Sequence, residues 1–293
     1  MDIRTALKQA IAQLRDAHVP SYTLAAELLL LHTLGRDRTW LYAHPEELLS
    51  QAEARAFSAL LARRAAGEPT QYLTGKQEFW GLEFEVTRDV LIPRPETEHV
   101  IEVALDRLAV REIRNGRKQT LTGEGLQIVD VGTGSGCIAI ALARELPAAR
   151  PILATDTSDA ALAVAKRNAV RHSVRDRIAF LQMNLLTPLA GMYDAIVSNP
   201  PYIGRKEKET LMREVREHEP EVALYGGEEG YEIYTDLIAQ AVHSVKPGGL
   251  LVLELGHNSL PAVQPLLEPP HWTNVGVTND LAGIPRVIAA ERA

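Results

Sequence analysis

Four consecutive residues, Asn199-Pro200-Pro201-Tyr202, follow an apolar stretch and have the side chains needed to hold a planar amide. An amide nitrogen is a poor nucleophile, because its lone pair is delocalised into the carbonyl group. The Asn199 side-chain oxygen and the Pro200 main-chain carbonyl can accept its two hydrogens, and Tyr202 can stack on its flat face. The prolines lack N–H groups and cannot continue an inner strand. The pattern predicts a stiff loop that positions such a nitrogen in line with an electrophilic carbon, without a strong general base.

A glycine-rich segment, Asp130-Val131-Gly132-Thr133-Gly134-Ser135-Gly136, joins a predicted strand to a predicted helix. Glycines permit tight turns and close approach of a ligand, and the helix N-terminus offers free N–H groups. Cysteine at position 137 breaks the dinucleotide fingerprint Gly-x-Gly-x-x-Gly/Ala. The acid before the first glycine would stand near a ligand cation, such as the amino group of a methionine moiety. A purely structural turn is the alternative interpretation.

Asp156 follows the next predicted strand. An acid at the end of that strand can accept hydrogen bonds from both hydroxyls of a ribose. NAD and S-adenosylmethionine share this sugar, so Asp156 does not distinguish between them. A surface acid or a helix cap is the alternative interpretation.

These three motifs need a common scaffold, and the pattern from residue 126 onward predicts one. Apolar stretches alternate with helical patterns, which indicates parallel βαβ units in a doubly wound sheet. Ligands of such sheets bind beyond the carboxyl ends of the strands, where the motifs fall. The predicted strands are 126–130, 152–155, 178–181, 195–198 and 250–255, and the predicted helices are 137–146, 159–170 and 231–245.

The first 78 residues or so are predicted to be all-helical. Apolar residues recur at helical spacing from Ile3, and Pro20-Ser21 ends that helix. A second apolar helix is expected to end at Gly35, and Ser50-Gln51-Ala52-Glu53 predicts a capping box that begins a helix running to Gly67. This region is either a packing module or a recognition domain for a macromolecular substrate.

The period changes over 78–92, which predicts a β-hairpin. A helix is predicted from Glu98 to about Val110. Residues 111–125 are polar and contain glycine, so we expect a surface loop there.

Composition and charge narrow the class of partner. The net charge is −7, from 31 basic and 38 acidic side chains, which argues against a surface that grips nucleic-acid phosphates. The single cysteine, Cys137, excludes an intrachain disulfide and favours a reducing compartment. The start of the sequence has no signal-peptide pattern, and the apolar run Leu28–Leu31 is too short to span a bilayer. With no Cys/His cluster at metal-ligand spacing, we expect a cytoplasmic protein without a metal and without direct binding to nucleic acid or membrane.

The combination of motifs resembles one family, the release factor glutamine methyltransferases, also called protein-(glutamine-N5) methyltransferases. The resemblance covers nearly the whole chain. Besides the glycine loop and residues 198–203, the stretches that carry it are Arg38–Pro45, Gly67–Gly75, Glu78–Gly81, Ile92-Pro93-Arg94-Pro95-Glu96-Thr97-Glu98, Lys246–Gly249 and Asp280–Arg286.

The resemblance implies an α/β fold: a class I methyltransferase, Rossmann-like seven-stranded sheet with a small all-helical N-terminal domain and a connecting β-hairpin. We expect a helical substrate-recognition domain at 1–78, a hairpin and linker at 79–97, and the S-adenosylmethionine-dependent methyltransferase domain at 98–293.

The resemblance also implies methyl transfer from S-adenosyl-L-methionine, giving S-adenosyl-L-homocysteine, to the side-chain N5 of glutamine in the Gly-Gly-Gln motif of class I peptide chain release factors. We expect a monomeric enzyme that acts in translation termination. Asn199 and Pro200 would be catalytic, and Asn199, Pro200, Pro201 and Tyr202 would bind the glutamine. The expected cofactor-binding residues are Asp130, Gly132, Thr133, Gly134, Ser135, Gly136, Asp156, Leu185 and Asn199.

The sequence departs from the family at two places, and other functions stay open. Asn184 stands where the family often has Asp, which predicts altered adenine contacts without loss of binding, and Tyr231 replaces a frequent Leu. A ribosomal-protein glutamine methyltransferase is the near alternative, although residues 95–98 favour release factors. A DNA or RNA adenine N6-methyltransferase would use residues 199–202 on a flipped base. A non-enzymatic S-adenosylmethionine sensor would bind the cofactor without turnover.

Overall fold

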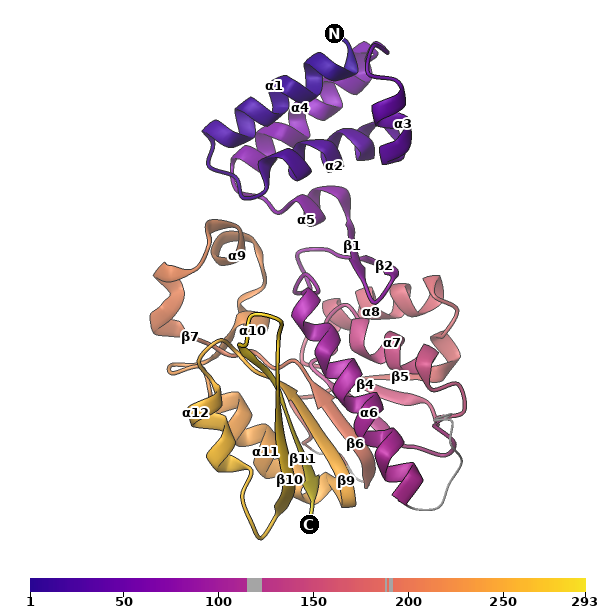
Figure 1. Cartoon of the computed structure of the whole chain (residues 1–293), viewed down its shortest axis with the longest axis vertical. Helices are drawn as coiled ribbons and strands as arrows, with labels where there is room; N and C mark the ends of the chain where they lie inside the picture. The colour runs from indigo at the N-terminus through magenta and orange to yellow at the C-terminus, as the bar shows by residue number, and fades with distance from the viewer. Residues whose placement is uncertain (115–122, 188, 190–191) are drawn as a thin grey trace. The chain divides into compact units, whose positions relative to one another are not determined.

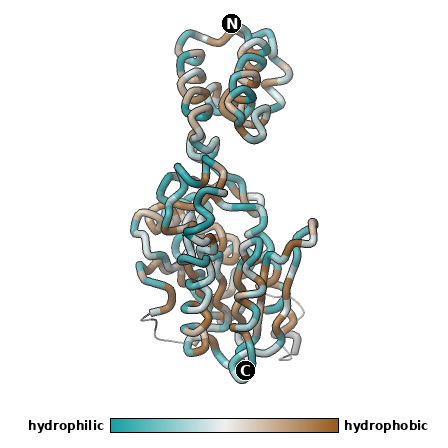
Figure 2. The backbone as a smooth tube through the Cα atoms, turned by 90° about the vertical axis from the view of Figure 1, so that its left-hand side faces the viewer, coloured by the Kyte–Doolittle hydropathy of each residue, from teal (hydrophilic) through white to brown (hydrophobic). Residues whose placement is uncertain are grey.

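The computed structural model describes residues 1–114, 123–187, 189 and 192–293 (Figure 1). The chain forms two compact units. The first, the helical unit, comprises Met1–Lys76 and Leu211–His218, and the second, the sheet unit, comprises Gln77–Thr210 and Glu219–Ala293. Along the helices of both units, hydrophobic and hydrophilic residues alternate, as expected for elements that bury one face (Figure 2).

The helical unit has the caps that the sequence predicts. The Ser50 hydroxyl accepts from the Glu53 N–H at 3.2 Å, and the Glu53 carboxylate accepts from the Ser50 N–H at 2.8 Å, so the predicted capping box is confirmed. Gly35 ends the second helix in a left-handed conformation, also as predicted. The helices of residues 1–76 are α1 (Ile3–Asp16), α2 (Tyr22–Leu34), α3 (Arg38–Ala43), α4 (Gln51–Ala65) and α5 (Thr70–Thr74).

A segment from late in the chain completes the helical unit, which the sequence did not predict. Helix α9 (Arg213–His218) belongs to it. The buried guanidinium of Arg64 forms an ion pair with Glu214 at 2.5 Å and also donates to the Glu68 carbonyl at 3.2 Å. The charge of a buried arginine in α4 is therefore paired by a residue that lies 150 positions further along the chain.

The predicted hairpin is present as β1 (Lys76–Phe79) and β2 (Leu82–Glu85). Its two turn residues, Trp80 and Gly81, both have positive φ, which suits a tight two-residue connection. The 3-10 turn η1 (Pro95–Thr97) then leads into α6 (Glu98–Arg114). Because α6 continues to Arg114, the surface loop predicted at 111–125 is wrong for 111–114, and 115–122 lie outside the described residues.

Seven strands form the central sheet, in the order β10-β11-β9-β6-β3-β4-β5. Five of them are parallel, as predicted, whereas β11 runs antiparallel to both β9 and β10. The strands are β3 (Ile128–Val131), β4 (Ile152–Asp156), β5 (Ile178–Gln182), β6 (Tyr193–Ser198), β9 (Val245–Glu254), β10 (Trp272–Asn279) and β11 (Pro285–Arg292).

Each face of this sheet has its own hydrophobic core, because successive strand residues point to opposite faces. On β6, Ala195 and Val197 pack in one core and Ile196 packs in the other. The first core includes residues of α6, α7 (Cys137–Glu145) and α8 (Asp159–Arg171), and the second includes residues of α11 (Glu232–Ser244) and α12 (Leu260–Val263). Helices on both faces make this the doubly wound architecture that the sequence predicts.

Short elements complete the sheet unit. Two of them, β7 (Ile203–Gly204) and β8 (Tyr225–Gly227), pair in parallel as a separate two-stranded sheet. The others are η2 (Arg175–Arg177), η3 (Arg205–Thr210), α10 (Glu221–Leu224) and η4 (Gln264–Leu266). Among the described helices, none is long and apolar enough to cross a membrane.

A fully buried asparagine ties the hairpin to the glycine loop. The Asn168 amide donates to the carbonyls of Glu85 at 3.0 Å and Ser135 at 2.9 Å, and its oxygen accepts from the Glu85 N–H at 2.7 Å. One side chain of α8 thus satisfies three main-chain groups, of which the Ser135 carbonyl is buried and the two of Glu85 are part-buried.

We expect Asn168→Ala to lower the free energy of unfolding by roughly 2–4 kcal/mol, because it leaves buried main-chain groups unsatisfied. Chemical denaturation would measure this. Arg167→Ala is the matched control: Arg167 lies on the same helix and bonds the exposed carboxylate of the same Glu85, so its loss should cost less than about 1 kcal/mol. Equal effects of the two substitutions would contradict the assignment.

Candidate functional site

The register of the sheet brings the sequence motifs into one row. Val131 of β3 pairs with Thr155 of β4 on one side and with Ser198 of β6 on the other. The next residue along the chain is Gly132 after Val131, Asp156 after Thr155 and Asn199 after Ser198. Three motifs separated by many residues therefore begin at neighbouring strand ends, where doubly wound sheets bind ligands.

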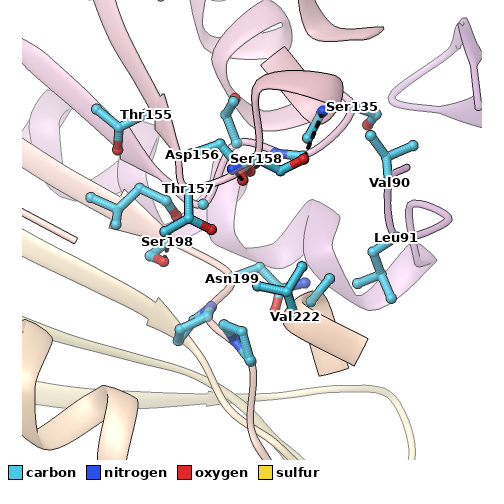
Figure 3. Close-up of a pocket in the computed structure, with 18 of the residues that line it drawn as sticks. Val90, Leu91, Ser135, Thr155, Asp156, Thr157, Ser158, Ser198, Asn199 and Val222 are labelled. Atoms are coloured by element: carbon cyan, nitrogen blue, oxygen red, sulfur yellow. Dashed lines mark hydrogen bonds between the residues drawn. The ribbon is translucent and has the colours of Figure 1, made fainter. Parts of the chain in front are cut away.

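A cavity of about 510 Å³ lies at these strand ends. Figure 3 shows residues from four parts of the chain around one hollow. They are Asp156 at the end of β4 with Thr157 and Ser158 after it, Asn199 after β6, Val90 and Leu91 after the hairpin, and Val222 of α10. The volume falls in the range that holds a nucleoside-sized ligand. Of the predicted site residues, the cavity is lined by Gly132, Thr133, Gly134, Ser135, Asp156, Leu185, Asn199, Pro200 and Pro201, and not by Asp130, Gly136 or Tyr202.

The glycines of the loop serve two purposes. Gly132 and Gly134 have φ values of +72° and +53°, and no side chain or main-chain atom crowds the space that a Cβ would take at Gly132. Gly136, at φ +84°, packs closely, because a Cβ there would lie 3.1 Å from both Ala165 and Ile140. The first two glycines therefore leave room for a ligand, and the third lets the loop pack against the helices.

Asp156 faces the cavity while holding the loop in shape. Its carboxylate accepts from the Gly134 N–H and the Ser158 N–H, both at 2.9 Å. Burial raises the pKa of Asp156, and these hydrogen bonds oppose the shift. A carboxylate has about four acceptor positions, so capacity remains for the hydroxyls of a ribose.

Asp130 lies behind the loop and not in the cavity. One carboxylate oxygen accepts from the Thr133 hydroxyl at 2.6 Å and from the Ala139 N–H at 3.2 Å, whereas the other has no hydrogen-bond partner. Burial raises the pKa of this fully buried acid to about 7. Asp130 braces the glycine loop against α7, and contact with a ligand cation stays a prediction.

The Asn199 side chain has a defined orientation. Its Nδ2 donates to the Thr97 hydroxyl at 3.0 Å. With the NH2 group engaged there, the Oδ1 atom is the end of the amide that remains to accept from a ligand. The preceding hydroxyl of Ser198 donates to the Val131 carbonyl at 2.7 Å, which ties the end of β6 to the end of β3.

The residues after Asn199 have different surroundings. Pro200 and Pro201 line the cavity. The Tyr202 ring packs against Gly256, since a Cβ at Gly256 would lie 2.7 Å from the ring, and burial raises the pKa of Tyr202. Tyr202 thus supports the loop from behind, and stacking on a substrate stays a prediction.

Sequence reasoning missed how this loop is held in place. A Cβ at Gly226 would lie 2.4 Å from the Pro201 carbonyl oxygen, and one at Gly230 would lie 2.5 Å from the Tyr202 carbonyl oxygen. Main chain therefore packs directly on main chain beside the prolines. The glycines of 226–230 were the available signal for this contact.

The apolar wall of the cavity was also missed. Val90, Leu91 and Val222 line it, and nothing in their sequence context marks them as site residues. Leu185, with φ +49°, lines the cavity beside Asn184 and Met183, after β5. The apolar wall suits a flat heterocycle, and the polar groups near Asp156 suit a sugar.

These residues fit S-adenosylmethionine on the observations above. The cavity has room at Gly132, an acid with spare acceptor positions at Asp156, and apolar side chains around Leu185. Within the described part of the chain, no group of three His, Cys, Asp or Glu residues could hold a metal ion.

Comparison with known proteins agrees with this arrangement. Residues 5–75 match the family described as PrmC N-terminal domain, and residues 118–228 match the methyltransferase small domain. The chain is 41% identical to a release factor glutamine methyltransferase of Koribacter versatilis and 42% identical to one of Moorella thermoacetica, each over 100% of this chain and 99% of the relative. A methyltransferase structure from Pyrococcus furiosus shares the fold, with a TM-score of 0.51 and 17% identity over 80% of this chain and 98% of that one.

We expect Asp156→Ala to weaken binding of S-adenosyl-L-homocysteine by about 10- to 100-fold, because hydrogen bonds to a charged group contribute roughly 1.5–3 kcal/mol. Isothermal titration calorimetry would measure the affinity. Asp159→Ala is the control, since Asp159 is exposed at the start of α8 and does not line the cavity. An unchanged affinity in the Asp156 variant would rule out the ribose role.

Proposed function

The chain belongs to the family of release factor glutamine methyltransferases, and on this basis we propose that it methylates N5 of the glutamine in the Gly-Gly-Gln motif of class I peptide chain release factors. It is an S-adenosylmethionine-dependent methyltransferase. The observation that carries the proposal is the Asn199 carboxamide at the end of β6, with its NH2 group bound to Thr97 and its oxygen left as an acceptor at the cavity.

The cavity would hold the methyl donor through its loops. We assign Gly132, Thr133, Gly134 and Ser135 to the methionine part, Asp156 to the ribose and Leu185 to the adenine. Asp130 and Gly136 take part indirectly, by shaping the loop. When bound, S-adenosylmethionine supplies an electrophilic methyl group.

The glutamine amide would be held by acceptors. Asn199 Oδ1 and the Pro200 carbonyl accept its two N–H groups, which orients the nitrogen and raises its electron density. Pro201 stiffens the loop and Tyr202 supports it from behind. Catalysis then comes mainly from positioning, because the methylated amide cation loses its proton readily to water.

The finer features of the reaction are proposals as well. We assign recognition of the folded release factor to residues 1–78, the connection to 79–97 and methyl transfer to 98–293. The net charge of −7 supports a protein substrate over direct binding to nucleic acid. We propose that the enzyme acts as a monomer. We also propose that it acts in the cytoplasm, for which its single cysteine is the supporting observation.

We expect Asn199→Ala to lower methylation of an unmodified release factor by about 100-fold or more, because the amide loses an orienting acceptor. Incubation with tritiated S-adenosylmethionine, followed by mass spectrometry of the labelled peptide, measures rate and position together.

A release factor with Asn in place of the motif glutamine is the substrate control and should take up no label. Label in ribosomal proteins and not in the release factor would favour the alternative glutamine substrate. Label in nucleic acid would favour the adenine alternative. Full turnover by the Asn199 variant would contradict the catalytic assignment.

The recognition role of the helical unit makes a separate prediction. Leu24 and Leu28 of α2 lie one turn apart and are 48% and 39% exposed, although both are apolar. We expect the double variant Leu24→Glu, Leu28→Glu to raise KM for the intact release factor by about 10-fold. A tenfold change corresponds to about 1.4 kcal/mol, and burying two leucines against the release factor would contribute more than that.

Activity on a short Gly-Gly-Gln peptide should not change in that double variant. Val170→Glu is the control, because Val170 is 63% exposed on α8 of the sheet unit. If the double variant methylates the intact release factor with unchanged kinetics, α2 is not part of the recognition surface.

A further inference from the structure

A buried hydroxyl in the cavity lining and a buried carboxylate outside that lining accompany the Asn199 amide. Thr97 ends η1 and is 2% exposed, and its hydroxyl accepts from Asn199 Nδ2 at 3.0 Å. Glu254, also 2% exposed, is the last residue of β9. Its carboxylate interacts with the Thr97 hydroxyl, and its Oε2 atom has no hydrogen-bond partner. Thr97 lines the cavity, whereas Glu254 does not, and the role described above does not use this acid.

The sheet register explains why Glu254 lies there. Ser198 of β6 pairs with Leu253 of β9, so the next residues, Asn199 and Glu254, continue the same row of strand ends. Glu254 is thus the fourth member of the row that contains Gly132, Asp156 and Asn199. An acid is costly at such a buried place unless its charge has partners.

The chemistry of the three groups sets the direction of the hydrogen bonds. An ionised carboxylate can only accept, so the Thr97 hydroxyl must give its single proton to Glu254. The hydroxyl then has only lone pairs left for Asn199, which must turn its NH2 group toward Thr97. The Asn199 oxygen consequently faces the cavity, where the substrate amide needs an acceptor.

We propose that Thr97 is a positioning residue that fixes the orientation of the Asn199 carboxamide, and that Glu254 sets the direction of this chain of hydrogen bonds. The proposal rests on the proposed function, since it explains how the acceptor for the glutamine N–H is oriented. Without the chain, the amide can rotate by half a turn and present its NH2 group, which repels the substrate N–H.

Two nearby arginines act against the effect of burial on Glu254. Arg94 forms an ion pair with Glu219, and Arg286 bonds Asp280 at 2.8 Å. Both arginines favour the ionised form of Glu254, whereas burial and the neighbouring Glu96 oppose it and raise the pKa of Glu254 to about 7. Assays at about pH 8 therefore test the ionised form.

The test compares two substitutions at Thr97 in the full-length enzyme. Thr97→Val keeps the shape of the side chain but removes the hydroxyl, so we expect kcat on the release factor to fall by about 100-fold. Thr97→Ser keeps the hydroxyl and should restore most of the activity. Affinity for S-adenosyl-L-homocysteine should stay close to wild type in both variants. The melting temperature of Thr97→Val should fall by about a few degrees, because buried polar groups lose their partner, and Thr97→Ser should restore it.

Glu254→Met provides an independent variant, because methionine has nearly the length of glutamate and only a weak sulfur acceptor for the Thr97 proton. We expect kcat to fall while thermal stability is kept or raised, since a buried charge is replaced by an apolar group. Loss of activity together with retained stability separates orientation of Asn199 from a merely structural role.

The outcomes distinguish the two proposals. Full kcat in Thr97→Val, or failure of Thr97→Ser to restore activity, would overturn the positioning role while the proposed function stands. A wild-type enzyme that labels no release factor would instead refute the proposed function.

Discussion

The alignment of four strand ends is the constraint on which the candidate site depends. Four residues pair in one row across the sheet: Thr155 of β4, Val131 of β3, Ser198 of β6 and Leu253 of β9. Each is followed by a residue that belongs to the site or supports it. Because side chains alternate between the two faces of a sheet, a slip of one residue in any strand would reverse the direction of its last side chain. The two hydrophobic cores fix this register, so residues far from the cavity determine where its polar groups lie.

Much of the sheet unit could be predicted from sequence, because a buried parallel strand leaves a strong local signal. The helix of α8 begins at Asp159 and β4 begins at Ile152, as predicted. The final strands were harder, since much of β10 is exposed and the place of β11 in the sheet depends on its pairing with β9, which is distant in the sequence. For the same reason no pattern in 211–218 indicated that Glu214 would pair with Arg64.

The candidate site was predicted in part. The predicted residues that do not line the cavity lie behind its wall. Motifs located the loops correctly at the cavity, and Asn199 and Asp156 both face it. Motifs could not show that Asp130 is enclosed behind the loop or that the Tyr202 ring turns toward Gly256. Whether a polar group lines a cavity or braces its wall depends on packing from distant segments, which a local pattern does not contain.

The position of β11 also has a consequence for how the protein is made. Strand β10 precedes β11 in the chain, yet β11 lies between β10 and β9. During synthesis, Trp272–Asn279 therefore has no neighbour in the sheet until Pro285–Arg292 has left the ribosome. Until then the hydrogen-bonding edge of β9 stays open, and an open strand edge can pair with another chain. The newborn protein is thus exposed to edge pairing and aggregation until β11 is in place, and chaperones would be of most use in that interval.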